Sequence, residues 1–204
     1  MVWGCEYDVN EFCKQGKFSI KKLNIAARPQ LQKTPWKRLV LGADTIPRHQ
    51  FILWLTLNQR LATVDRLAKW KIDVPKDCVL CTSQKEEMFD HLFFECEYAK
   101  SIWAILLNWL GERHSIESWE KEVQWLTKRT NNGRPRAQVV IFLFAATIYY
   151  TWLERNMRRF QKQYTTYAGR IREIVLQLHI KGQQRSKWKT LLDQLNSFST
   201  CNNV

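Results

Sequence analysis

Residues 78–96 read CVLCTSQKEEMFDHLFFEC, and the interpretation of the whole chain begins with this stretch. It holds Cys78, Cys81, His91 and Cys96 in the spacing C-x2-C-x9-H-x4-C. Two cysteines separated by two residues can form a knuckle that presents both thiolates to one ion, and zinc accepts three sulfurs and one imidazole in a closed tetrahedron. Because no position is left for water, the pattern predicts one structural zinc ion. The alternative is a set of ordinary buried cysteines beside an unrelated histidine.

The spacing of the last two candidate ligands predicts an interruption of regular helix. His91 and Cys96 are five positions apart. On a straight helix of ~3.6 residues per turn their side chains would point roughly 140° away from each other. We therefore expect the chain to turn or distort between them, before a regular helix begins at Tyr98. The other cysteines match no ligand spacing: Cys5, Cys13 and Cys201.

The first ten residues lack the charged segment and apolar core of a secretory signal. We therefore expect an intracellular location, nuclear or cytoplasmic. In a reducing compartment, spaced cysteines indicate metal binding or catalysis and not disulfides.

The rest of the sequence predicts a mainly α fold. The 204 residues are 45% apolar and include ten Trp, but only seven Gly and five Pro. Apolar recurrence at helical spacing supports this class, with the zinc knuckle inserted between helices. The expected helices begin at Pro47 and cover Val64–Trp70, Tyr98–Leu110, a segment from Ser115 or Ser118 to about Lys128, Arg136–Tyr164, and about 167–180 and 186–197.

The predicted organisation has three parts. Residues 1–35 would form a short N-terminal hairpin, with extended pieces at Val2-Trp3 and 16–20, followed by a linker over 24–35. Residues 36–112 would form the zinc-binding domain, and 113–204 a helical, basic C-terminal region.

The longest apolar run is VVIFLFAATIYYTWL, residues 139–153. Fifteen residues of helix span roughly 22 Å, which is short of the ~20 residues that cross a bilayer core. Charged residues lie close on both sides of the run. We therefore expect a long buried C-terminal helix and no membrane segment.

Basic residues gather on both sides of the cysteine segment. Residues 14–71 carry 13 basic and 2 acidic side chains, and residues 134–204 carry 12 and 3, whereas residues 72–133 carry 7 and 11. The net charge of the chain is +13. Such a surplus favours a polyanionic partner, of which nucleic acid is the commonest. The alternative is that Lys and Arg only keep an apolar chain in solution.

Several motifs together resemble the zinc-binding domain that follows the reverse transcriptase in plant LINE-type (non-LTR) retrotransposon polyproteins. They are GKFS at 16–19, PRHQFILWLTLNQRLATVDRLAKW at 47–70, the knuckle at 78–81, DHLFFEC at 90–96 and Ile102-Trp103. Trp152 to Phe160 resembles the basic helix beyond that domain. The resemblance implies that Cys78, Cys81, His91 and Cys96 are the zinc ligands.

The resemblance implies a nucleic-acid context but no catalytic activity. The chain shows no Y-x-D-D polymerase motif and no ribonuclease H carboxylate set, so we expect a fragment, a degenerate copy or a domesticated descendant. His49, His114 and His179 have no evident acidic or nucleophilic partner by spacing, and we expect no enzyme. Near the ligands, Glu86, Glu87 and Asp90 are expected to support the site or to face solvent.

Two kinds of partner remain open from the sequence. The first is RNA or DNA, and the expected phosphate contacts are Lys21, Lys22, Lys37, Arg38, Arg155, Arg158, Arg159 and Lys162. The second is a protein that docks on apolar or Trp-rich faces. The oligomeric state does not follow from the sequence.

Overall fold

The computed structural model of the chain describes residues 12–14, 17–27, 34–41, 44–83, 85–130 and 133–195. The chain divides into two compact units, Met1–Thr34 and Pro35–Val204. The three-part division expected from the sequence stays a prediction.

The first unit contains a short hairpin followed by a helix. Strand β1 (Cys13–Lys14) pairs antiparallel with β2 (Lys17–Phe18). Helix α1 (Ile20–Ala27) begins directly afterwards, so helix covers the first residues of the expected linker. The expected N-terminal hairpin is present, but its first strand is β1. The predicted extended piece at Val2-Trp3 lies outside the described residues.

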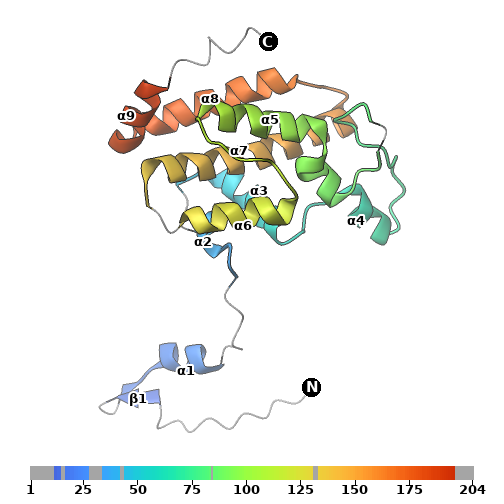
Figure 1. Cartoon of the computed structure of the whole chain (residues 1–204). Coiled ribbons are helices and arrows are strands. Elements are labelled where there is room, and N and C mark those ends of the chain that lie inside the picture. The colour runs from blue at the N-terminus through green and yellow to red at the C-terminus, as the bar shows by residue number, and fades with distance from the viewer. Residues whose placement is uncertain are drawn as a thin grey trace. The chain divides into compact units, whose positions relative to one another are not determined.

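The second unit is built from helices, as the mainly α prediction required (Figure 1). The helix expected over Arg136–Tyr164 is regular only as far as residue 156. A π-helical segment over residues 157–161 follows it. The elements in chain order are α2 (Lys37–Leu41), α3 (Pro47–Leu57), α4 (Val64–Lys69), η2 (His91–Glu95), α5 (Glu97–Trp109), α6 (Trp119–Arg129), α7 (Pro135–Asn156), η4 (Met157–Gln161), α8 (Tyr167–Gln183) and α9 (Ser186–Gln194).

Helix α7 forms the centre of this unit, where it packs against α3, α5, α8 and α9 (Figure 1). Every residue from Val139 to Ile148 is buried. A helix that is apolar all round needs neighbours on every side, which explains the missing polar stripe. By length and hydropathy alone this helix would also suit a membrane span. However, 78% of its most apolar 18-residue stretch is buried inside the protein. The predicted long buried helix is confirmed.

Aromatic side chains connect the cysteine segment to this central helix. The ring of Phe94 in η2 lies 5.6 Å from that of Phe144 in α7 and 6.1 Å from that of Trp119 in α6, centroid to centroid. Trp103 of α5 packs edge-on against Phe144 at 5.5 Å. Aromatic pairs of this kind add to the burial of apolar area. The C-terminal end of the candidate metal site is therefore anchored in the main core.

Candidate metal centre

A short hairpin-like loop presents the first two cysteines. Its two sides are held by a bridge between Asp77 and Glu86, by a hydrogen bond from Cys78 N to Lys85 O (2.9 Å), and by one from Glu87 N to residue 76 O (2.7 Å). The four-residue turn from Cys78 to Cys81 lies inside this loop. The two-residue gap predicted the knuckle, and backbone pairing on both sides of it holds the loop in which it lies.

The second pair of ligands lies across a distorted turn, η2. Phe93 has φ −109° and ψ 97°, and Phe94 has φ 79° and ψ −8°, so neither is helical. Cys96 is extended and donates its N–H to His91 O at 2.6 Å. The left-handed φ of Phe94 is uncommon for a residue with a Cβ. The predicted irregularity between His91 and Cys96 is confirmed, and it turns both side chains toward the knuckle.

The four predicted ligands meet in one cluster. One donor atom from each of Cys78, Cys81, His91 and Cys96 lies within 4.8 Å of all the others. The Sγ atoms of Cys78 and Cys96 are 3.9 Å apart, and Cys81 Sγ lies 3.3 Å from His91 Nε2. In a zinc tetrahedron with ~2.3 Å bonds to sulfur and ~2.0–2.1 Å bonds to nitrogen, these edges would be ~3.8 Å and ~3.6 Å. The donor set therefore fits a zinc-type metal site.

The electrostatics of the cysteine pair favour one thiolate over two. Hydrogen bonding from Cys96 lowers the pKa of the Cys78 thiol to about 5, with further help from backbone hydrogen bonds at Leu80 and Cys81. The pKa of Cys96 is raised instead, because it bonds to Cys78 and is buried. Adjacent buried thiolates need a compensating cation, which is what a bound metal supplies.

A buried carboxylate lies behind the knuckle. The side chain of Glu87 is 0% exposed and accepts hydrogen bonds from Arg155 Nε at 2.9 and 3.0 Å and from Arg155 Nη2 at 2.6 Å. Arg159 Nη2 donates to Glu87 Oε2 at 2.9 Å, and Val64 N donates to Glu87 Oε1 at 3.3 Å. Two guanidinium groups thus bind one carboxylate that has no access to water. Glu87 belongs to the loop, whereas Arg155 lies in the last turn of α7, so this network ties the loop to the central helix.

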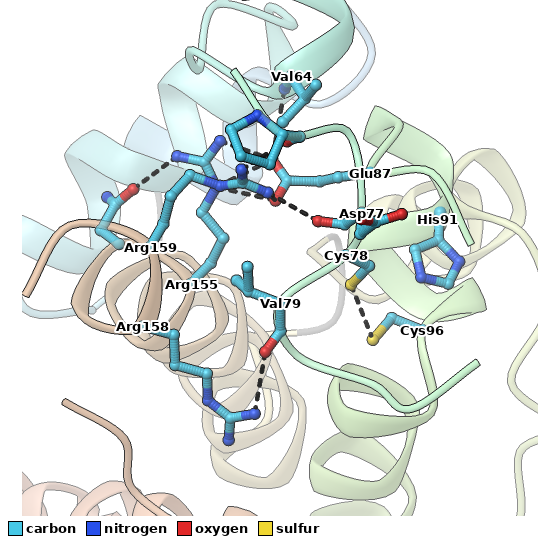
Figure 2. A network of polar contacts seen from close by, with 12 residues as sticks. Val64, Asp77, Cys78, Val79, Glu87, His91, Cys96, Arg155, Arg158 and Arg159 are labelled. Carbon is cyan, nitrogen blue, oxygen red and sulfur yellow. Dashed lines mark hydrogen bonds and ion pairs between the residues drawn. The ribbon is translucent and has the colours of Figure 1, made fainter. Parts of the chain in front are cut away.

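Arg155, Arg158 and Arg159 form a cluster that we call the arginine cluster. Two of its members also donate hydrogen bonds to backbone carbonyl groups of the loop. Arg158 Nη1 donates to the carbonyls of residues 79 and 80 at 3.1 and 3.2 Å. Arg159 donates to those of residues 75 and 77 at 2.7 and 2.9 Å. Figure 2 shows these arginines on one side of the loop, with His91 and Cys96 on the other. On one side the loop faces the candidate ligands His91 and Cys96. On the other side it is hydrogen-bonded to arginines of α7 and η4.

Three of the predicted phosphate contacts, Arg155, Arg158 and Arg159, have acidic partners within the protein. The side chains of Arg155 and Arg159 are 1% and 6% exposed, and both bind Glu87. Arg158 is 22% exposed and pairs with the buried Glu154 at 2.8 Å. All three guanidinium groups are therefore engaged in contacts within the protein, with Arg155 buried and Arg158 and Arg159 partly buried. The other predicted contacts are exposed, on α1 (Lys21, Lys22), on α2 (Lys37, Arg38) and just after η4 (Lys162).

The sequence held one signal for this network. Thr147, Thr151 and Arg155 follow one another at intervals of four and are all buried. Residues four apart lie on one helix face, so Arg155 continues a face already committed to the core. A buried arginine needs an acidic partner. That partner is Glu87, which lies 68 residues away in the sequence, so the helix pattern alone could not identify it.

One of the histidines also differs from expectation. The Nε2 atom of His114 lies 2.8 Å from Glu122 Oε1, a partner that the spacing did not reveal. The Glu122 side chain is 0% exposed and also accepts from Trp103 Nε1 at 2.8 Å and from Glu117 N at 3.0 Å. With these donors around it, Glu122 holds the segment before α6 against α5.

Residues 18–103 match the family model for zinc-binding in reverse transcriptase. The match includes all four clustered ligands and ends inside α5. No curated protein and no solved structure matches the chain. This part of the chain is therefore similar to the zinc-binding domain of reverse transcriptases, and the cluster of three cysteines and a histidine fits that class. The arginine cluster lies beyond the matched residues.

Proposed function

We propose that the protein is a non-catalytic zinc-binding module that holds one structural zinc ion and binds nucleic acid. The observation that carries the zinc assignment is the convergence of four donor atoms within 4.8 Å of one another. Three thiolates and one imidazole complete a tetrahedron, and structural zinc sites are closed in this way. Cys78, Cys81, His91 and Cys96 would hold the ion, and its chemistry there is to neutralise thiolates and crosslink the loop to η2.

The proposed origin is a plant LINE-type retrotransposon polyprotein. The support is the set of motifs at 16–19, 47–70 and 90–96 together with the family match over 18–103. Trp152 to Phe160 extends the resemblance into the helix that carries the arginine cluster. In this proposal the C-terminal helical region is part of the module, because its arginines hold the zinc loop.

The proposed nucleic-acid contacts are the exposed basic residues of the earlier prediction: Lys21, Lys22, Lys37, Arg38 and Lys162. Support comes from the charge of the chain, +13, because phosphate neutralisation is the main source of sequence-independent affinity. The arginine cluster is left out of this proposed surface, because its guanidinium groups already pair with Glu87 and Glu154. We propose the same intracellular, nuclear or cytoplasmic location as before, where nucleic acid is available.

Filter binding of the zinc-loaded protein to random-sequence RNA and DNA, at salt from 50 to 200 mM, tests this function. We expect log K to fall linearly with log salt, because each phosphate contact releases counterions. A Lys37→Gln Arg38→Gln variant should bind more weakly and with a shallower slope. Binding that ignores salt, or no binding at low salt, would refute the nucleic-acid proposal.

Zinc stoichiometry is tested separately. Elemental analysis of the purified protein should give one zinc per chain, and Cys78→Ser should give none. A wild-type protein that folds without zinc after exhaustive chelation would contradict the structural role.

A second candidate is a protein-interaction or scaffold domain. The observation that favours it is a hollow of about 480 Å³ between the segment just before α2, the end of α3, and α6. Trp36, Leu57, Trp119 and Val123 contribute apolar lining. Sedimentation velocity with and without Val123→Glu tests whether this surface joins two copies. Unchanged monomer behaviour of both proteins, combined with salt-dependent nucleic-acid binding, would favour the first proposal.

A further inference from the structure

Two aromatic side chains on α3 face solvent beside each other. Phe51 is 58% exposed and Trp54 is 36% exposed. Their ring centroids lie 6.1 Å apart and their planes differ by only 25°, so the rings are stacked. The opposite face of the helix buries His49, Leu53 and Thr56. The core therefore does not account for these two rings.

Arginines extend this pair into a longer row. The guanidinium carbon of Arg60 lies 5.9 Å from the Trp54 ring. Arg66 donates to the carbonyl of Gln59, the residue before Arg60, and its guanidinium lies 5.0 Å from the Trp70 ring. Trp70 is 52% exposed. We call Phe51, Trp54, Arg60, Arg66 and Trp70 the aromatic–arginine row.

The charge around the row decides which partner it suits. Residues 47–72 carry five basic side chains and one acidic side chain. Exposed aromatics alone would suit an apolar protein surface. Rings interleaved with guanidinium groups, on a surface of net positive charge, suit a ligand that presents flat π-faces and negative charge together. Single-stranded nucleic acid has both, in its bases and its phosphates.

Duplex nucleic acid fits the row less well. In a duplex the base faces are stacked on one another and only their edges are accessible. Stacking on Trp or Arg requires bases that are unpaired and splayed out. Three of the five side chains in the row, Phe51, Trp54 and Trp70, present aromatic faces, which stack on bases and cannot hydrogen-bond to their edges through the ring face.

Resting on the proposed nucleic-acid function, we propose that the aromatic–arginine row binds single-stranded nucleic acid by stacking bases on Trp54 and Trp70 while Arg60 and Arg66 meet phosphates. The lysines and arginine of α1 and α2 then supply general affinity, and the row supplies the preference for single strands.

Fluorescence anisotropy with a labelled 15-nucleotide oligothymidylate, and with the duplex it forms with oligoadenylate, tests the proposal. The wild-type zinc-loaded protein should prefer the single strand. The double variant Trp54→Leu Trp70→Leu should bind the single strand at least ~30-fold more weakly, because two stacking partners are lost, with little change for the duplex. Trp54→Phe Trp70→Phe should retain most of the affinity, because Phe still stacks and Leu does not.

The control is Tyr164→Leu, since this aromatic residue is 77% exposed and lies outside the row. It should leave both affinities unchanged, and circular dichroism should show the same melting temperature for all variants. If the wild type binds neither probe at low salt, the proposed function itself fails. If it binds but the Leu double variant binds the single strand equally well, or loses both probes equally, only the stacking proposal is overturned.

Discussion

Neutralising Glu87 is the sharpest test of the network behind the metal site. Glu87→Gln keeps the size of the side chain but removes the charge that balances Arg155 and Arg159. One amide –NH₂ would then point at guanidinium groups that donate only. Glu86→Gln is the matched control, since its side chain lies next in the same loop, is 65% exposed and faces Lys76 at 3.9 Å.

The expected magnitude follows from burial. Glu87 is 0% and Arg155 1% exposed, so removing the carboxylate charge leaves a cation in the interior without its counterion. Breaking a buried pair in this way costs about 3–5 kcal/mol, which is roughly 6–20 °C in melting temperature for a domain of this size. The control should change the free energy of unfolding by less than about 0.5–1 kcal/mol, as is usual for an exposed pair.

The assay is chemical unfolding at saturating zinc, followed by circular dichroism, with zinc affinity measured by competition with a chelator. We also expect Glu87→Gln to weaken zinc binding, because the loop that carries Cys78 and Cys81 loses its support from α7. A loss below 1 kcal/mol, or equal losses for Glu86→Gln and Glu87→Gln, would refute the reasoning that the network holds the loop.

Three further predictions concern metal, pH and chain length. Cys96→Ala should abolish zinc retention and lower the melting temperature, whereas Cys13→Ala should retain one zinc per chain by elemental analysis. Burial and Arg48 lower the pKa of His49 to about 3. The unfolded chain therefore takes up a proton below its ordinary pKa of 6.5, and stability falls with falling pH. Relative to His49→Leu, the wild type should lose about 2 kcal/mol of unfolding free energy between pH 7.5 and 5, and equal pH slopes would contradict this. A fragment of residues 35–112 lacks the arginine cluster, and its zinc loop should be cleaved by protease much faster than in the full chain.

The sequence predicted best where the determining interactions are local. The gap of two residues between Cys78 and Cys81 suits a knuckle whatever surrounds it. The five-residue step from His91 to Cys96 cannot be made on a straight helix, so the distortion at Phe93 and Phe94 follows from geometry alone. The run around Phe144 is apolar on all sides, and a helix of that kind can only be stable when covered.

The sequence predicted worst for the basic side chains. Arg155 and Lys162 carry the same charge in the sequence, yet the structure buries the first and exposes the second. The difference depends on Glu87, which lies 68 residues from Arg155. In the sequence, Glu87 is one of two adjacent glutamates in an acidic loop. A charge count cannot distinguish an arginine that neutralises a buried carboxylate from one that faces a phosphate.

Spacing and periodicity act over a few residues, so the sequence predicted the four clustered candidate ligands, the helical class and the buried central helix. How the knuckle is supported, and which basic groups remain on the surface, depends on contacts between segments that are far apart in the chain. Desolvation causes this dependence, because a charge removed from water needs a partner within ~3 Å, and the fold can supply that partner from any part of the chain. For Arg155 and Arg159 that partner is Glu87. Through it, α7 and η4 support the loop that carries Cys78 and Cys81.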